Sequence, residues 1–159
     1  MERFETLELA AYPRRVLLMV GATLLVLAID LASKVVVVAV HPHTLLFNVS
    51  QRSPFGLGES LIVVFVAMSL LACVLPSRAV ALGAGIALGA ALGNLTSRHV
   101  WAGRGGSPDF IPFGDGSTGN VADVMIVVGG FLTVGGALAW LAWTVVRTYR
   151  QPRPTGADG

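Results

Sequence analysis

The stretch VLLMVGATLLVLAIDLASKVVVVAV, residues 16–40, decides the fold class of this chain. A helix needs roughly 20 predominantly apolar residues to cross the hydrocarbon core of a bilayer, and this stretch meets that length. It follows Arg14 and Arg15, as the apolar region of a signal peptide would, but it continues without a small-residue cleavage site. We therefore expect a retained first membrane span.

Three further apolar segments follow, at residues 61–75, 79–95 and 121–146. The first of these is short, and Pro76 separates it from the next, because proline lacks an amide hydrogen and disfavours helical backbone at the preceding residue. Over the whole chain of 159 residues, 54% are hydrophobic and only 13% are charged, which excludes an ordinary soluble domain. The sequence predicts an all-α membrane protein with four transmembrane helices.

The positions of the arginines indicate how these helices are oriented. Cytoplasmic loops of membrane proteins carry an excess of basic residues, so the side with seven arginines is expected to be cytoplasmic, with both termini on it. The polar segments 41–60 and 96–120 then form a small extracytoplasmic platform of loops and β-like segments. The cytoplasmic group is Arg3, Arg14, Arg15, Arg78, Arg147, Arg150 and Arg153, and the outer group is Arg52, Arg98 and Arg104.

The chain is expected to form one domain. Residues 1–150 make up the four-helix transmembrane domain, and residues 151–159, rich in proline and glycine, form a disordered cytoplasmic tail. Gly85, Gly89 and Gly93 recur at every fourth position of the third apolar segment, which lets helix backbones approach closely. We favour packing within one bundle, and a dimer interface stays open as the alternative.

Asp30 and Lys34 do not belong in lipid. They lie four residues apart on one face of the first predicted helix, and either charge alone would cost about 2.5 kcal/mol or more near the bilayer centre. We expect the two to form an ion pair, with a structural role favoured over catalysis or ion conduction. Because Asp30 is near the outer half of the span, we also expect it to meet polar groups of a neighbouring helix.

The histidines do not indicate a metal site. His41, His43 and His99 could supply ligands, but their spacing resembles no zinc motif. We expect no metal and no cofactor. A nucleic-acid partner is not expected either, because the basic residues cluster beside apolar segments and the net charge is only +2.

Asp109 and Asp123 are the most informative pair of the outer segments. Asp123 opens the last apolar segment, where a carboxylate caps the first turn of a helix and interacts favourably with its dipole. Two carboxylates at a partly desolvated interface cannot both ionise easily, and a pair sharing one proton can activate water for amide hydrolysis without a metal. The residues alone leave the capping role and the catalytic role open.

The order of these motifs resembles one family. Over residues 16–146, the chain is similar to lipoprotein signal peptidase, also called signal peptidase II, a four-span aspartyl protease of the bacterial cytoplasmic membrane. The resemblance rests on Asp30 to Lys34, on Gly89-Ala90-Ala91-Leu92-Gly93-Asn94 followed by Arg98, on Asp109-Phe110-Ile111, and on Asn120-Val121-Ala122-Asp123.

The resemblance implies an activity and a set of site residues. Asp109 and Asp123 match the catalytic aspartates, which activate water on the bond preceding a lipid-modified cysteine. The substrates would be prolipoproteins with a diacylglyceryl-modified cysteine, met among membrane lipids. In this comparison Arg98 holds a substrate carbonyl or oxyanion, and Asn120 orients the carboxylate one helical turn on. The implied substrate-binding residues are Asn94, Arg98, Asn120 and Asn48, and Asp30 and Lys34 match a structural polar pair.

Two departures from the family pattern keep other functions open. Ser97 stands where the family usually has an aspartate, which removes a carboxylate that would help fix Arg98, and residues 48–56 replace a shorter, less polar element. These changes favour, as an alternative, a catalytically impaired paralogue that binds lipopeptides. A small-solute or proton transporter that uses Asp30 and Lys34 is less favoured, because the inner halves of the spans carry almost no polar residues.

Overall fold

The computed structural model describes residues 2–41, 46–48, 65–70, 72, 74–114 and 116–150. This part of the chain holds three long helices, one 3₁₀ turn and two small antiparallel sheets. The helices are α1 (Glu2–Val40), α3 (Arg78–Val100) and α4 (Val121–Arg150), with the 3₁₀ turn η1 at Ala102–Arg104. The strands are β1 (Leu46–Asn48), β2 (Ser107–Asp109), β3 (Ile111–Pro112) and β4 (Thr118–Gly119).

The three long helices are each apolar and long enough to cross a membrane. They contain the predicted segments 16–40, 79–95 and 121–146 and extend beyond them. Residues 65–70, within the predicted segment 61–75, are helical too, while much of that segment lies outside the described residues. Large apolar side chains such as Leu24 and Phe131 remain exposed on the helices, as expected for surfaces that face lipid. The chain is therefore a multi-pass membrane protein.

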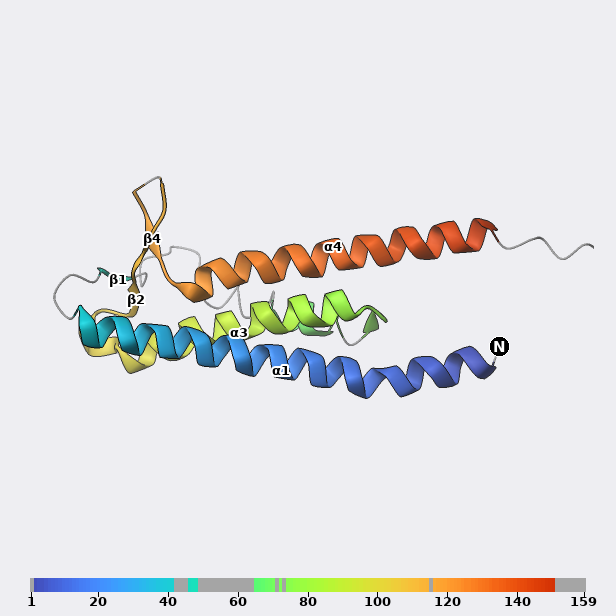
Figure 1. Cartoon of the computed structure of the whole chain (residues 1–159), viewed down its shortest axis with the longest axis horizontal. Coiled ribbons are helices and arrows are strands. Elements are labelled where there is room, and N and C mark those ends of the chain that lie inside the picture. The colour runs from blue at the N-terminus through green and yellow to red at the C-terminus, as the bar shows by residue number, and fades with distance from the viewer. Residues whose placement is uncertain are drawn as a thin grey trace, which may run out of the picture.

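Helix α3 lies between α1 and α4 (Figure 1) and packs against both of them. Its small residues allow this. A Cβ atom added to Gly85 would lie only 3.0 Å from the Cβ of Ala22, and one added to Gly89 would lie 3.0 Å from the Cα of Thr23, both on α1. The Thr23 hydroxyl donates a hydrogen bond of 3.1 Å to the carbonyl of Gly85. The glycine face thus serves packing within one bundle, as favoured from the sequence.

Helices α3 and α4 approach closely at two facing glycines. A Cβ atom on Gly83 would lie 2.8 Å from the carbonyl oxygen of Gly129, and a Cβ atom on Gly129 would lie 2.7 Å from the carbonyl oxygen of Gly83. The next residue, Gly130, has open space where its Cβ would be. Gly129 therefore allows the close approach of α3 and α4, whereas Gly130 plays no part in it.

The two sheets lie at the end of the bundle where α1 ends and α4 begins (Figure 1). Strand β1 pairs with β2 so that Leu46 lies opposite Asp109, and β3 pairs with β4 so that Ile111 lies opposite Gly119. The chain turns from η1 into β2 through two left-handed glycines, Gly105 (φ 101°) and Gly106 (φ 122°). These sheets correspond to the predicted platform of β-like segments.

We predict opposite effects for the two adjacent glycines of α4. Gly129→Ala forces α3 and α4 apart and should lower the free energy of unfolding by about 1–3 kcal/mol, the usual range for overpacking. Gly130→Ala should leave stability unchanged or raise it slightly, because alanine favours helix and nothing is displaced. Thermal unfolding in detergent measures both, and equal melting temperatures for the two variants would contradict this helix contact.

Candidate active site

The Asp30 and Lys34 side chains are fully buried and form the predicted ion pair, with the ammonium nitrogen 2.7 Å from Oδ2 of Asp30. The Lys34 ammonium also donates to Oδ1 of Asn94 and to Oγ of Ser97, each at 2.9 Å. An ammonium has three hydrogens and no acceptor, so all of its hydrogen-bonding capacity is used here. The pair therefore ties α1 to two polar residues of α3.

The second oxygen of Asp30 reaches a third helix. Its Oδ1 accepts a hydrogen bond of 2.9 Å from the backbone amide of Ala122, the second residue of α4. Amides in the first turn of a helix have no acceptor within the helix, and a negative charge there interacts favourably with the helix dipole. Gly93 of α3 leaves room for this contact, because a Cβ there would lie 3.0 Å from Cγ of Asp30. The expectation that Asp30 meets a neighbouring helix is confirmed.

Asn120 and Asp123 cap the start of α4 reciprocally. Oδ2 of Asp123 accepts from the Asn120 amide at 2.9 Å, and Oδ1 of Asn120 accepts from the Asp123 amide at 3.3 Å. This is the arrangement of a capping box, with asparagine and aspartate in the two positions. The Asp123 side chain is only half-buried. The capping role that the sequence left open for Asp123 is confirmed.

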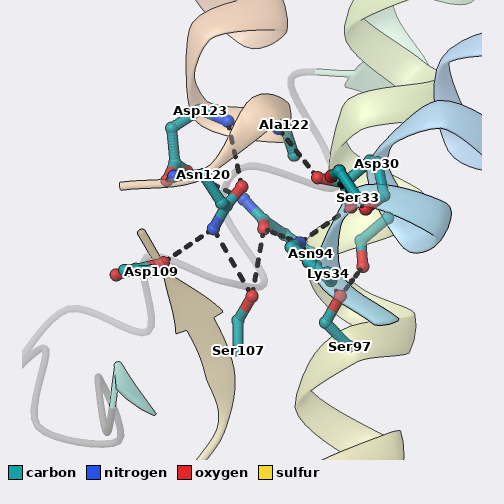
Figure 2. A network of polar contacts seen from close by, with 11 residues as sticks. Asp30, Ser33, Lys34, Asn94, Ser97, Ser107, Asp109, Asn120, Ala122 and Asp123 are labelled. Carbon is teal, nitrogen blue, oxygen red and sulfur yellow. Dashed lines mark hydrogen bonds and ion pairs between the residues drawn. The ribbon is translucent and has the colours of Figure 1, made fainter. Parts of the chain in front are cut away.

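Asp109 reaches the same asparagine from β2. The Nδ2 of Asn120 donates a hydrogen bond of 2.7 Å to Oδ1 of Asp109, whose side chain is 5% exposed. Between the two residues the chain folds back on itself as the β3–β4 hairpin, with Phe110 donating to the carbonyl of Gly119 at 2.8 Å. Figure 2 shows the two aspartates on either side of Asn120. Asn120 thus donates to the Asp109 carboxylate through its side chain and to the Asp123 carboxylate through its backbone amide.

Asn94 completes the connection between the ion pair and the aspartates. Its Nδ2 donates to Oδ1 of Asp123 at 2.9 Å, while its Oδ1 accepts from Lys34. The hydroxyl of Ser107 lies 3.4 Å from Nδ2 of Asn120 and 3.5 Å from Oδ1 of Asn94. The hydrogen bonds in Figure 2 therefore run without a break from Asp30 on α1 to Asp109 on β2.

Two of the predicted substrate-binding residues, Arg98 and Asn48, are not joined to this network by any side-chain hydrogen bond of the described residues. Arg98 is exposed near the end of α3, and within the described part of the chain no hydrogen bond or ion pair joins it to the network. Asn48 lies in β1 opposite Ser107, so its backbone borders the site, while its side chain is outside what the structure describes. The structure therefore brings together Asn94 and Asn120 of the predicted set, along with both aspartates.

The interpretation of Ser97 from sequence requires correction. From the sequence, we expected the side chain at position 97 to affect how Arg98 is held. Instead, Ser97 is fully buried, accepts from Lys34 and donates to the carbonyl of Gly93 at 2.5 Å. The physical reason is helical spacing, since Ser97 lies three residues after Asn94 and shares its face. The same reasoning could have found Ser107, which lies two residues before Asp109 in an extended strand and therefore on the same side.

The fold and the site define a multi-pass membrane protein with a pair of aspartates at one end of its helices. Comparison with known proteins identifies the family. Residues 22–139 match the model of the signal peptidase II family. Over 143 residues the chain is 33% identical to the lipoprotein signal peptidase of Streptomyces griseus, with 76% of this chain and 73% of that protein covered. The chain belongs to the signal peptidase II family of aspartic peptidases, which act on prolipoproteins.

We predict that Asn120→Ser separates helix capping from the contact with Asp109. Serine is as good a helix N-cap as asparagine, so α4 should still begin at the same residue, and any fall in the melting temperature should come from the lost contact with Asp109. The shorter serine side chain cannot reach both the Asp123 amide and the Asp109 carboxylate. Losing the hydrogen bond to the Asp109 carboxylate should lower kcat about 10- to 100-fold. Cleavage assays and thermal unfolding in the same detergent check this. Unchanged kcat would mean that the bond between Asn120 and Asp109 is not needed.

Proposed function

We propose that this chain removes signal peptides from prolipoproteins by cutting the bond before a diacylglyceryl-modified cysteine, with Asp109 and Asp123 as the catalytic pair. Family membership supports the activity. The observation that supports the pair is the shared asparagine, whose Nδ2 lies 2.7 Å from Asp109 and whose amide lies 2.9 Å from Asp123. No cofactor, metal or nucleic acid takes part in the proposed reaction.

The proposed chemistry needs one proton on the pair. One carboxylate, ionised, takes a proton from a water molecule as the water oxygen attacks the scissile carbonyl carbon. The other aspartate, protonated, donates its proton to the carbonyl oxygen, which becomes a hydroxyl in the tetrahedral intermediate. When the carbon–nitrogen bond breaks, the aspartate that took the proton from water gives it to the amine nitrogen, and the hydroxyl returns its proton to the other aspartate as the carbonyl forms again. Asn120 keeps both carboxylates in place throughout, through hydrogen bonds to each.

The position of the site fits an amphipathic substrate. The aspartates lie where α4 begins, beside the two small sheets at one end of the apolar bundle. A lipid-modified cysteine keeps its acyl chains in the bilayer and its peptide at the headgroup level, so its scissile bond would lie at this depth among membrane lipids. We propose that Asn94 and Asn48 border the bound peptide and that Arg98, exposed near the end of α3, holds a substrate carbonyl or the developing oxyanion.

The proposed topology has four spans in the bacterial cytoplasmic membrane, with both termini in the cytoplasm. Segment 61–75 supplies the additional span, so that residues 1–150 form one transmembrane domain, while the tail expected at residues 151–159 lies outside the described residues. The basic residues support this orientation, because seven arginines fall on the proposed inner side and three on the outer side.

Reporter fusions test the topology. A reporter fused after Arg150 should stay cytoplasmic, and one inserted at Gly105, in the turn before β2, should be exposed outside. The two fusions serve as controls for each other, because the proposed topology places the two reporters on opposite sides of the membrane. The reverse pattern would place the aspartates in the cytoplasm and contradict the proposed substrate.

Replacing either aspartate tests the chemistry. Asp109→Asn and Asp123→Asn should each abolish release of the signal peptide from a diacylated substrate in detergent, because an amide can neither accept the proton of water nor donate an acidic one. Both variants should still fold and bind the substrate, and chelators should not affect the wild type. Asp115→Asn is the control, since Asp115 lies between the two in sequence among Gly114 and Gly116, and it should retain activity.

The outcomes of this assay separate the candidate functions. Full activity of either variant would contradict an aspartate pair. A wild-type protein that binds the diacylated substrate and never cuts it would instead support the lipopeptide-binding paralogue.

A further inference from the structure

We propose that Lys34 is a positioning residue for the hydrolysis, and that it acts through Asn94 on the carboxylate of Asp123. This inference rests on the proposed role of Asp123. Two successive hydrogen bonds, each 2.9 Å long, join the three residues (Figure 2). Lys34 donates to Oδ1 of Asn94, and Nδ2 of Asn94 donates to Oδ1 of Asp123. The buried ion pair therefore does more than neutralise charge within the bundle.

The two neighbours of Asn94 leave its amide one orientation. Lys34 is a donor only, so it requires the oxygen of the amide, and an ionised Asp123 is an acceptor only, so it requires the nitrogen. Turning the amide over would place its NH₂ against the ammonium and its oxygen against the carboxylate. Both contacts would then be repulsive. The charge on Lys34 thus keeps a donor aimed at Asp123.

The position of Lys34 is itself fixed. Its ammonium has three acceptors, one each on Asp30, Asn94 and Ser97. Because Ser97 spends its only hydroxyl hydrogen on the carbonyl of Gly93, it can only accept from Lys34. The ammonium therefore cannot turn away from Asn94 without losing a buried hydrogen bond, and its side chain is fully buried.

Asp123 is held at both oxygens as a result. Oδ1 accepts from Asn94 and Oδ2 accepts from the amide of Asn120. The second bond belongs to the cap of α4 and persists without Lys34. The first bond depends on the orientation of Asn94. Loss of Lys34 should therefore free one oxygen of Asp123, which disturbs the geometry of the pair while α4 still begins at the same residue.

Electrostatics act in the same direction. The Lys34 ammonium also attracts the negative charges of Asp123 and Asp109 across the intervening amide. The charged groups of this network are Asp30 and Lys34 on α1, Asp109 on β2 and Asp123 on α4. Because the test below replaces the whole pair, it removes one charge of each sign, and its expected effect comes from the lost hydrogen bond to Asn94 rather than from a change in net charge.

The test replaces the whole ion pair, because Lys34 alone cannot be removed without leaving Asp30 charged and buried. In Asp30→Asn/Lys34→Met, the new amide can still accept from Ala122, while the donor to Asn94 is lost. In Asp30→Asn/Lys34→Gln, a neutral donor remains. We expect the Met variant to lower kcat about 10- to 100-fold at unchanged KM, as residues one contact removed from a site commonly do. The Gln variant should recover part of this loss.

One further readout distinguishes positioning from a structural role. In an Asn94→Ala background, removing the ion pair should cause no further loss of kcat, because the connection is already broken. Thr23→Val is the matched control. It removes a buried hydrogen bond between the same helices, α1 and α3, away from the network, and it should lower the melting temperature without changing kcat.

The outcomes separate this inference from the proposed function. If Asp123→Asn keeps activity, the proposed pair itself is wrong. If Asp123→Asn is inactive but the double variants match Thr23→Val in kcat, Lys34 is only structural and the inference is overturned. Equal kcat losses from the ion-pair change with and without Asn94 would also overturn it. Should the Met variant not fold, the kcat of the Gln variant, compared with and without Asn94, still decides between these outcomes.

Discussion

A lysine ammonium buried among apolar helices must find an acceptor for every hydrogen, and the arrangement of this protein follows from how Lys34 does so. Its three acceptors lie on α1 and α3, and the carboxylate of its ion-pair partner Asp30 extends to the first turn of α4. One buried pair thus fixes three helices relative to one another near the end of the bundle that carries the small sheets. The small residues of α3 make this possible, because they let α1 and α4 approach closely enough for short side chains to meet.

The same residues stabilise the fold and organise the site. Asn120 and Asp123 cap α4, and Asn120 also holds Asp109. A capping role and a catalytic role are often treated as alternatives for an aspartate at the start of a helix. The two roles do not exclude each other here, because the cap fixes Oδ2 of Asp123, Asn94 fixes Oδ1, and the residue is only half-buried. A pair of carboxylates held this rigidly needs little reorganisation when it reacts.

Much of this could be predicted from sequence where the determinants are local. Apolar length indicated the helices, a spacing of four indicated the pair of Asp30 and Lys34, and the position of Asp123 indicated a cap. Contacts across the fold could not be predicted in detail, since periodicity does not say which helix faces which. The bond from Asp30 to the amide of Ala122, 92 residues away, is of this kind. Ser97 was misinterpreted because its neighbour in sequence, Arg98, lies on a different face of α3.

The claim that Asp30 fixes the start of α4 is tested most directly by amide hydrogen exchange at Ala122. Amides of a first helical turn normally exchange quickly, because they have no acceptor within the helix. We expect slow exchange of Ala122 in the wild type. In Asp30→Leu/Lys34→Met, which replaces the pair with apolar side chains and leaves no unpaired charge, this protection should be lost while the amides of α4 beyond Gly129 stay protected. Unchanged protection of Ala122 in that variant would contradict the account.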